Sequence, residues 1–496
     1  MKHFKRSAIA SVINLALFGI PDAHADTEAL ERRIRELESR LERLDQAGAL
    51  VNKPVAATPD VEKLARKVNT LERKLEVQDE VTTSTFKKLP VFEAGEGGFK
   101  ISSSDKKHQL RIRGAVQTDG RFYIADNSFA GTDKFELKQG RVWLEGYFFK
   151  DIYFKIMPDF AASGNILPDA YLDYAYHPAA SLLVGKFKPA ISLERLQGDS
   201  DGTFLERAFP TYLASNRDVG IQLHGAFSKP GYKTETVAGP IDAKNTFIYH
   251  IGVSNGSGDD GSPNNNAPDT DDNKEVNGRL FAHPFQHTGY SWLEGLGFGV
   301  AGSIGNPNKQ ALKVQATPLG RSTYLDYAKV NTGFVAPTSD GAAYRIYPQA
   351  YWFSGPFGAI GEYVVSSQHL VSGKTDIQQN NTAWQFLASY VVTGEDNSFS
   401  GVKPIRNFDP LKGNWGALQL AARYSELDVD NDTFLIVDPN QSASKAKAWT
   451  IGANWYLNSN AIIRADYENV AFDGGAAKGL NLANEQVFTT RFQLSF

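Results

Sequence analysis

The chain ends on a stretch that decides its fold, residues 488–496, FTTRFQLSF. On an extended backbone, one face of this stretch carries the apolar Phe492, Leu494 and Phe496. The other face carries Arg491 between a threonine and a glutamine. This alternation has the period of two residues that defines a β-strand. The stretch therefore predicts a strand with one apolar and one polar face.

The same alternation appears in other parts of the chain. It recurs in residues 110–118, 141–148 and 169–176, and clusters of turn-forming residues separate these runs. In the second run, Val142 and Leu144 lie on the face opposite Arg141 and Glu145. We therefore expect an all-β fold from about residue 90 to the end of the chain.

The first 25 residues have the form of a secretory signal. Lys2, Lys5 and Arg6 make the start basic, residues 8–20 are apolar, and residues 23–25 read Ala-His-Ala. A basic start, a short apolar stretch and small residues at a cleavage site define such signals. We expect residues 1–25 to be removed during export; the alternative is a short buried helix.

Residues 26–89 carry two short heptad patterns. The apolar positions are Leu30, Ile34, Leu37, Leu41 and Leu44, and then Val61, Leu64, Val68, Leu71 and Leu75. A break at about residues 47–60 separates them. Apolar residues at alternating spacings of 3 and 4 predict a short coiled coil. Helices with only two or three heptads are marginally stable alone and therefore need a partner. That partner is the same segment of another subunit, peptidoglycan or a periplasmic protein; the alternative is a hairpin within one chain.

Alternating strands build either a soluble sandwich or a membrane barrel. The export signal, the final aromatic strand and a long polar connection at residues 254–277 favour the barrel. About 400 residues at roughly 25 per strand and loop give about 16 strands. We therefore expect residues 90–496 to form a transmembrane antiparallel β-barrel in the outer membrane of a Gram-negative bacterium.

The composition excludes several classes of protein. The chain has 496 residues, no cysteine and a net charge of −4. It therefore has no disulfide or cysteine nucleophile, and its slight acidity argues against nucleic-acid binding. No uncharged apolar run reaches the roughly 18 residues of a membrane-spanning helix.

No motif supports catalysis, a metal site or a cofactor. Residues 252–256 match G-x-S-x-G, but a polar loop follows where a nucleophile elbow needs a helix. Residues 269–273 begin like a calcium loop, although Lys274 stands where that loop needs glycine. Between His283 and His287, Pro284 disfavours the helix of a zinc site. We expect a protein that is not an enzyme.

Basic residues occupy positions suited to a pore lining. Arg141, Arg111 and Arg113 lie on the polar faces of their strands. Arg195 and Arg207 end two Leu-Glu-Arg triplets in a long, turn-rich connection, which we expect to fold into the lumen. Arginine binds oxyanions through its planar fork, and rings of cations select anions. For each arginine the alternative is a salt bridge to a carboxylate in the lumen.

Several segments carry a resemblance to a known family. They are residues 120–122 (GRF), 141–145 (RVWLE), the two Leu-Glu-Arg triplets, and residues 392–395 (VTGE), 422–424 (ARY) and 452–456 (GANWY). In order and spacing they resemble the outer-membrane phosphate- and polyphosphate-selective porins of the porin O/P type, over most of residues 108–496. The resemblance implies a homotrimer of sixteen-stranded barrels, each with an inward-folded loop and a central anion site.

The resemblance also implies roles for individual residues. Arg141, Arg195 and Arg207 correspond to basic residues of the anion site, and Asp169 falls near an acid that shapes it. A further family arginine falls on Ala115, for which Arg113 is the candidate replacement. The extracellular arginine ladder of the family corresponds, at wider spacing, to Lys309, Lys313 and Arg321.

The interpretation is a trimeric outer-membrane porin for small anions, with phosphate or polyphosphate as the expected solute. A general or sugar-conducting porin is the first alternative, favoured by Ala115 and by the net negative charge. A surface-tethering protein that works through its coiled coil is the second, and an outer-membrane hydrolase, which lacks a credible nucleophile and base, is the third.

Overall fold

The computed structural model describes residues 59–86, 88–124, 131–161, 166–234, 245–256 and 271–496, with five separate residues between 32 and 43. The chain divides into two compact units. One comprises Met1–Pro90 with Ser103–Asp105, and the other comprises Val91–Ser102 with Lys106–Phe496. The expected signal, the first heptad run and most of the break lie outside the described residues.

The second heptad run forms a helix, α3 (Pro59–Phe86). Proline suits the first position of a helix, because the amide that it lacks has no partner there. Val68, Leu71 and Leu75 are half-buried while most of their described neighbours are exposed. The helix is thus found where the heptads predict one, and its association with a partner stays a prediction. None of the described helices is long and apolar enough to cross a membrane.

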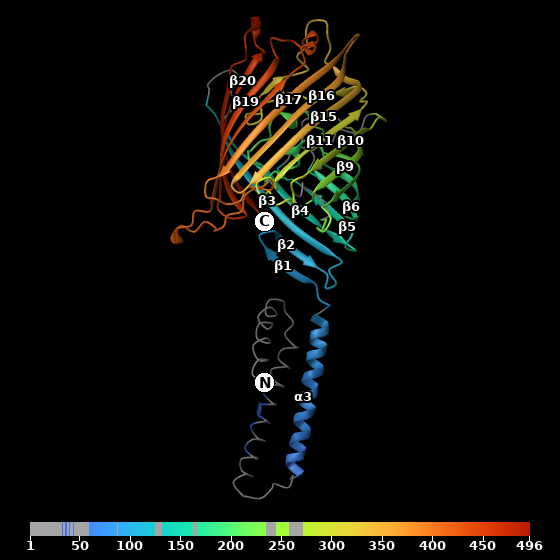
Figure 1. Ribbon diagram of the computed structural model, residues 1–496, viewed down its shortest axis with the longest axis vertical. Coiled ribbons are helices and arrows are strands. Elements are labelled where there is room, and N and C mark those ends of the chain that lie inside the picture. Colours follow the sequence, from blue (N-terminus) through green and yellow to red (C-terminus); the bar gives the residue numbers. More distant parts are fainter. Residues whose placement is uncertain are drawn as a thin grey trace. The chain divides into compact units, whose positions relative to one another are not determined.

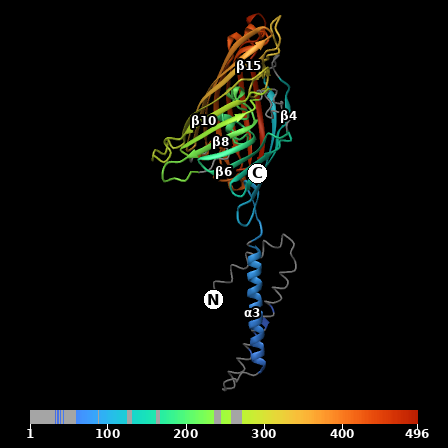
Figure 2. The ribbon, with the colours of Figure 1, turned by 90° about the vertical axis from the view of Figure 1, so that its right-hand side faces the viewer.

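Sixteen antiparallel strands form a closed barrel, as the sequence predicted. Each pairs with the next, and the last pairs with the first from Val487 opposite Tyr123 to Ser495 opposite Ala115. Their tilt is visible in β15–β17 in Figure 1 and in β6, β8 and β10 in Figure 2. The strands are β3 (Gln109–Tyr123), β4 (Lys134–Phe148), β5 (Ile152–Met157), β6 (Asp169–His177), β7 (Ala180–Phe187), β8 (Asp218–Phe227), β9 (Phe247–Ser254), β10 (Glu275–Ala282), β11 (Leu296–Gly305), β15 (Thr338–Ser354), β16 (Phe357–Ser372), β17 (Thr375–Val391), β18 (Ala417–Asp428), β19 (Ala443–Tyr456), β20 (Ala461–Gly474) and β21 (Glu485–Ser495).

Short elements complete the fold. A hairpin of β1 (Val91–Gly95) and β2 (Gly98–Ser102) extends the sheet beside β3. Strand β12 (Gln310–Ala311) pairs with β15, whereas β13 (Gln315–Ala316) and β14 (Thr323–Leu325) pair with each other. The short helices are α4 (Leu193–Leu196), η1 (Phe209–Leu213), η2 (Pro410–Lys412), η3 (Asn431–Leu435) and η4 (Ala477–Gly479).

Burial is inverted relative to a soluble sandwich. Arg491 is 2% exposed, whereas the next residue, Phe492, is 52% exposed. On β6, Asp173 is fully buried while Leu172 is 55% exposed. The outward faces of the strands are therefore apolar and the lumen faces polar, which is how a barrel sits in lipid. The faces predicted from the sequence are confirmed.

Long connections occur at both ends of the barrel. Antiparallel strands place successive connections at opposite ends. At the end where β3 begins and β21 finishes, residues 149–151, 178–179, 355–356 and 457–460 are short turns. Residues 228–246, 283–295 and 392–416 are longer connections at that same end, and 188–217, 255–274 and 306–337 are long ones at the other.

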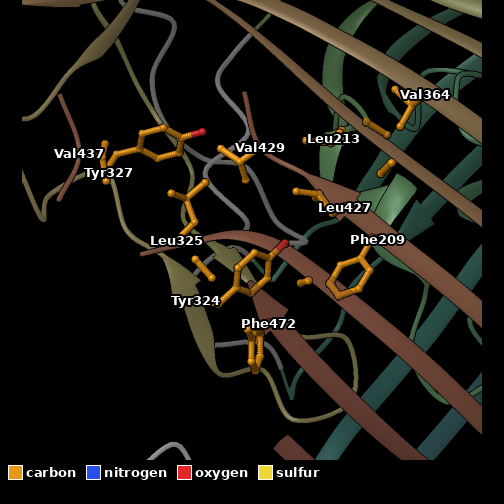
Figure 3. Packing of buried hydrophobic residues seen from close by; sticks show 14 of the residues in the cluster. Phe209, Leu213, Tyr324, Leu325, Tyr327, Val364, Leu427, Val429, Val437 and Phe472 are labelled. Carbon is orange, nitrogen blue, oxygen red and sulfur yellow. The ribbon is translucent and has the colours of Figure 1, made fainter. Parts of the chain in front are cut away.

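Among the connections that the structure describes, residues 188–217 and 306–337 pack together in the lumen around a shared hydrophobic core. We call residues 188–217 the first inward segment and residues 306–337 the second inward segment. Phe209 of the first and Tyr324 of the second pack edge to face, 6.0 Å between ring centroids. Figure 3 shows both beside Leu427 of β18 and Phe472 of β20. The lumen face thus carries apolar residues where the inward segments pack against it, whereas the sequence predicted a polar face there.

Side chains of the strands anchor the backbone of both segments. In the first segment, the Leu193 amide donates to Glu362 Oε2 at 2.8 Å and the Leu205 amide to Asp466 Oδ2 at 2.7 Å. In the second, the Leu319 amide donates to Glu468 Oε1 at 2.8 Å. Buried amides outside regular structure need such partners, because an unpaired one is costly.

Phe209→Ala should loosen the first inward segment without opening the barrel. Replacing a buried phenylalanine by alanine costs about 3–5 kcal/mol. Here that loss would weaken the packing of the first inward segment in the lumen. We expect faster proteolysis within residues 188–217 of the folded protein and noisier single-channel current. Phe298→Ala, on the outer face of β11, is the control and should change neither. Equal protease resistance in both variants would contradict the assigned role.

Candidate functional site

Two of the predicted arginines meet at one carboxylate. Arg141 of β4 and Arg207 of the first inward segment each form an ion pair with Asp199. Arg141 also donates from Nε to Asp159 Oδ2 at 2.7 Å. Arg207 donates to the Glu194 and Gln197 carbonyl oxygens at 3.2 and 3.1 Å. The first inward segment thus brings Arg207 close to Arg141 on the barrel wall. It also brings Asp199, whose carboxylate neutralises both arginines.

Asp199 is a fixed counter-ion within the lumen. Burial raises the pKa of Asp199, but the guanidinium groups of Arg207 and Arg141 outweigh burial and hold the pKa well below 3.8. Gln139 donates a further hydrogen bond to Asp199 Oδ2 at 3.0 Å. The carboxylate therefore stays ionised and occupies hydrogen-bond donors of Arg141, Arg207 and Gln139.

The other two predicted arginines have different partners. Arg195 is 9% exposed and donates to Asn216 Oδ1 at 2.7 Å and to the Thr211 carbonyl oxygen at 3.1 Å. It therefore braces the first inward segment internally. Arg113 pairs with Glu145 at 3.1 Å and lies 5.3 Å from the centroid of the Trp143 ring.

Asp169 and Ala115 lie on the lumen wall. Asp169 pairs with Arg217 at 2.6 Å and with Lys155 at 3.0 Å, so it helps to fix two lumen cations. Ala115 is buried and lies directly opposite Arg141 in the register of β3 and β4. Arg113 is directed to Glu145 and makes no contact with Asp199 that would place it beside Arg141 and Arg207.

The three predicted funnel residues do not form a row. Lys309 is exposed, and Lys313 Nζ lies 5.2 Å from the centroid of the Tyr212 ring. Arg321 instead pairs with Glu206 at 2.7 Å and with Glu136 at 3.0 Å. Arg321 therefore ties the second inward segment to the first and to β4.

Glu206 is the centre of a charge cluster that sequence reasoning missed. Besides Arg321 it pairs with Lys138 at 2.7 Å, with Arg491 at 3.6 Å and with Arg121 at 3.9 Å. Burial raises the pKa of Glu206, but Lys138 and Arg321 outweigh it and hold the pKa well below 4.5. The residue before Arg207 thus fixes the segment on the side away from Asp199.

A cavity of about 660 Å³ adjoins Asp199. Its basic lining residues are Arg111, Arg113, Arg141, Lys155, Lys188, Arg217 and Lys403. Its acidic lining residues are Glu96, Asp169, Asp173, Asp199 and Asp201. The terminal Phe496 also lines it, so it lies on the side of Asp199 toward the end of the barrel where the chain finishes. The lining thus holds more basic than acidic side chains, in a chain whose net charge is negative.

Four of these cations were not predicted: Lys155, Lys188, Arg217 and Lys403. A local signal exists for two of them, because Lys188 directly follows β7 and Arg217 directly precedes β8. Basic residues that flank an inward-folding connection are carried to the lumen wall at both of its ends. Lys403 gives no such signal, because it lies in a distant connection.

An apolar outer face, a polar lumen and connections folded across that lumen define the protein as an outer-membrane porin. The chain belongs to the phosphate-selective porin O and P family, whose model matches residues 110–496. Members of this family are channels and not enzymes. The protein is therefore a channel of the outer membrane, as the sequence predicted.

Individual relatives are distant. Porin O of Pseudomonas aeruginosa is 22% identical over 438 residues, 81% of this chain and 91% of that protein. The outer-membrane channel DcaP of Acinetobacter baumannii superposes with a TM-score of 0.46 at 13% identity, covering 80% of this chain and 99% of that one. The anion-selective porin of Comamonas acidovorans gives 0.45 at 11% identity, covering 78% and 100%.

Asp199→Asn should increase the preference for anions. It removes one negative charge between Arg141 and Arg207 and leaves two guanidinium groups without that partner. One unit charge at about 4 Å in water is worth about 1 kcal/mol, so we expect a rise of about fivefold in the chloride-to-potassium permeability ratio. The measurement is the reversal potential in a planar bilayer. Asp409→Asn, the same change in the exposed Lys412 pair, is the control, and equal shifts would exclude the assignment.

Moderate acid should leave Asp199 ionised. Its folded pKa is depressed, so its contribution to stability is present above the unfolded pKa near 3.8 and is lost only as the pH falls through the lower folded value. The infrared difference between the natural protein and D199N should show a carboxylate band at pH 4. A protonated carboxyl band already at that pH would show that the two ion pairs are weak.

Proposed function

We propose that the porin conducts small anions, with phosphate or polyphosphate as its solute. The observation that supports this most is the excess of basic side chains around the cavity beside Asp199. Arg141 and Arg207 reach this region from the wall and from the first inward segment. Their guanidinium groups offer charge-assisted hydrogen bonds that replace the hydration shell of an anion.

The proposal includes a low affinity for the solute at this position. Asp199 already occupies donors of Arg141 and Arg207, so an entering anion competes with a carboxylate that cannot diffuse away. Conduction requires sites that release the ion as readily as they bind it. The resident acid meets this requirement by limiting how tightly the two arginines hold a phosphate.

The family supports phosphate as the solute. The matching family is described as phosphate-selective, and the curated relative is Porin O.

We also propose that three chains associate, with residues 26–89 as a periplasmic coiled coil and residues 90–496 as the barrel. A related fold, OmpT of Vibrio cholerae, is described as a trimer.

A general or sugar-conducting porin is the second candidate. It is favoured by Ala115 at the position of a family arginine and by the neutralisation of Arg141 and Arg207 by Asp199. Such a channel would discriminate weakly between ions and would not be blocked by phosphate. The two candidates therefore differ in measurable currents.

The test is the reversal potential of the purified full chain in a planar bilayer under a KCl gradient, followed by titration with inorganic phosphate. We expect a potential near that of chloride and a phosphate-dependent fall in current. In Arg207→Ala the phosphate concentration for half block should rise about tenfold, the equivalent of one charged hydrogen bond.

The matched control is Arg406→Ala, which removes an exposed arginine of the β17–β18 connection. It should leave both currents unchanged. Weak or cation selectivity without block in the natural protein would overturn the anion function. Selectivity with block that Arg207→Ala does not alter would retain the function and exclude Arg207 from the site.

A further inference from the structure

The connection between β17 and β18 divides into two parts. The earlier part enters the lumen, where the Phe399 carbonyl oxygen accepts a hydrogen bond from Gln197 of the first inward segment at 2.9 Å. We call the later part, residues 404–416, the arm. Figure 1 shows the arm in orange, projecting from the barrel wall. The arm is therefore a candidate for contact with whatever surrounds the barrel.

The arm carries apolar side chains that the chain itself does not cover. Leu411 at its tip is 98% exposed, Ile405 is 75% exposed and Trp415 is 62% exposed. Single exposed apolar residues are common on proteins, but several on one element mark a surface that meets lipid or another protein.

The tip of the arm has a defined conformation. Asp409 and Asn414 exchange both backbone hydrogen bonds, at 2.9 and 3.0 Å, and close a tight hairpin around Leu411. Pro410 begins the short helix η2, and Gly413 ends it with a φ of 72°, a conformation that favours glycine. The backbone of the hairpin therefore holds Leu411 outward.

The base of the arm is attached to the outer face of the barrel. Trp455 lies on the outer face of β19, and its indole Nε1 donates to the Trp415 carbonyl oxygen at 2.7 Å. The ring of Phe408 packs edge to face on Trp455, with 5.3 Å between the centroids. The Phe408 amide also donates to the Leu457 carbonyl oxygen at 2.7 Å. The arm thus continues the apolar outer face beyond the ends of β18 and β19.

A second connection at the same end of the barrel is attached in the same way. Trp352 of β15 donates from its indole Nε1 to the Trp292 carbonyl oxygen at 2.7 Å. Trp292 is 60% exposed and the nearby Tyr290 is 61% exposed. Tryptophan and tyrosine concentrate where a membrane meets water, because their rings are apolar and carry one polar group. The shared attachment and the shared type of exposed ring indicate the level of the membrane surface.

The wall beside the arm is long enough to face lipid without help from another subunit. Strands β17, β18 and β19 have 17, 12 and 14 residues. About 9–11 residues of a tilted strand cross a bilayer. Strand β5, with 6 residues, is too short to do so. We therefore expect lipid, and not a neighbouring subunit, beside the arm.

From these observations we infer that the arm is an interfacial membrane anchor, and that its partner is the phospholipid surface at the end of the barrel where the chain finishes. Its exposed apolar residues enter the boundary between headgroups and acyl chains. Arg406 and Lys412 are exposed on the same segment, and such long side chains reach lipid phosphates while their stems cover apolar surface. With Asp409 as its one acid, the arm has a net charge of +1, which suits anionic headgroups.

The absence of cysteine from the chain allows a direct test. Leu411→Cys is labelled with an environment-sensitive fluorophore, and the full chain is placed in vesicles of phosphatidylcholine and phosphatidylglycerol in equal parts. The replaced side chain is 98% exposed, so the fold should not change. An interfacial segment lies about 5–10 Å deep at the headgroup boundary. Lipids that are spin-labelled near the headgroup should therefore remove most of the emission, and a water-soluble spin label should not.

The matched control is Leu435→Cys, which replaces a leucine 58% exposed in η3 at the other end of the barrel. Its fluorophore should be quenched by the water-soluble label alone. The same result for Leu411→Cys would overturn the anchor. Rapid disulfide cross-linking of Leu411→Cys between subunits, without quenching by lipid, would assign the arm to a second copy of the chain instead.

A charge variant tests the contact with headgroups. In the Leu411→Cys background, Arg406→Gln should weaken the lipid-bound state of the arm about fivefold, since a basic residue near an anionic surface contributes about 1 kcal/mol. Lys374→Gln, in the turn between β16 and β17 at the other end of the barrel, should have no effect. Equal quenching in both charge variants would exclude the contact with lipid phosphates. None of these measurements depends on the solute of the channel.

Discussion

The hydrogen bonds between β21 and β3 are the constraint on which the rest of the structure depends. Lipid offers no partner to a backbone amide, so a sheet in a membrane must leave no open edge. Once the sheet closes, its two faces meet different solvents. The outer face is apolar because it touches lipid, and the inner face is polar because it encloses water. Every lumen residue owes its position to that closure.

A closed barrel of this width still has to be narrowed, and here strand carboxylates and a hydrophobic core do so together. Backbone amides of the inward segments donate hydrogen bonds to Glu362, Asp466 and Glu468. The rings of Phe209 and Tyr324 pack among apolar residues of the strands. The polar bonds fix where the backbone lies, and the burial of aromatic rings stabilises it there. Beside the first inward segment a cavity remains, lined in part by Asp199, which pairs with both Arg141 and Arg207.

The sequence predicted the barrel because the alternation of polar and apolar residues can be recognised within a few positions of the chain. In each pair of neighbours, such as Arg491 and Phe492, the apolar residue indicates the side of the strand that faces lipid. The sequence predicted Arg141 on the lumen face for the same reason, and Arg207 in the lumen because a long, turn-rich connection was expected to fold inward. It did not reveal that both contact Asp199, since that depends on how a connection folds against a strand far away in the chain. Arg195 instead donates to Asn216 and to the Thr211 carbonyl oxygen of its own segment, and no local sequence pattern predicts these bonds. Lys403 comes from still farther away.

The hydrogen bond from Gln197 to Phe399 joins chain segments that enter the lumen from opposite ends of the barrel. The two peptides leave the barrel wall at opposite ends, so this hydrogen bond joins parts of the chain that start on different sides of the membrane. The two ends of the barrel are therefore joined inside the lumen by a contact that does not run along any strand.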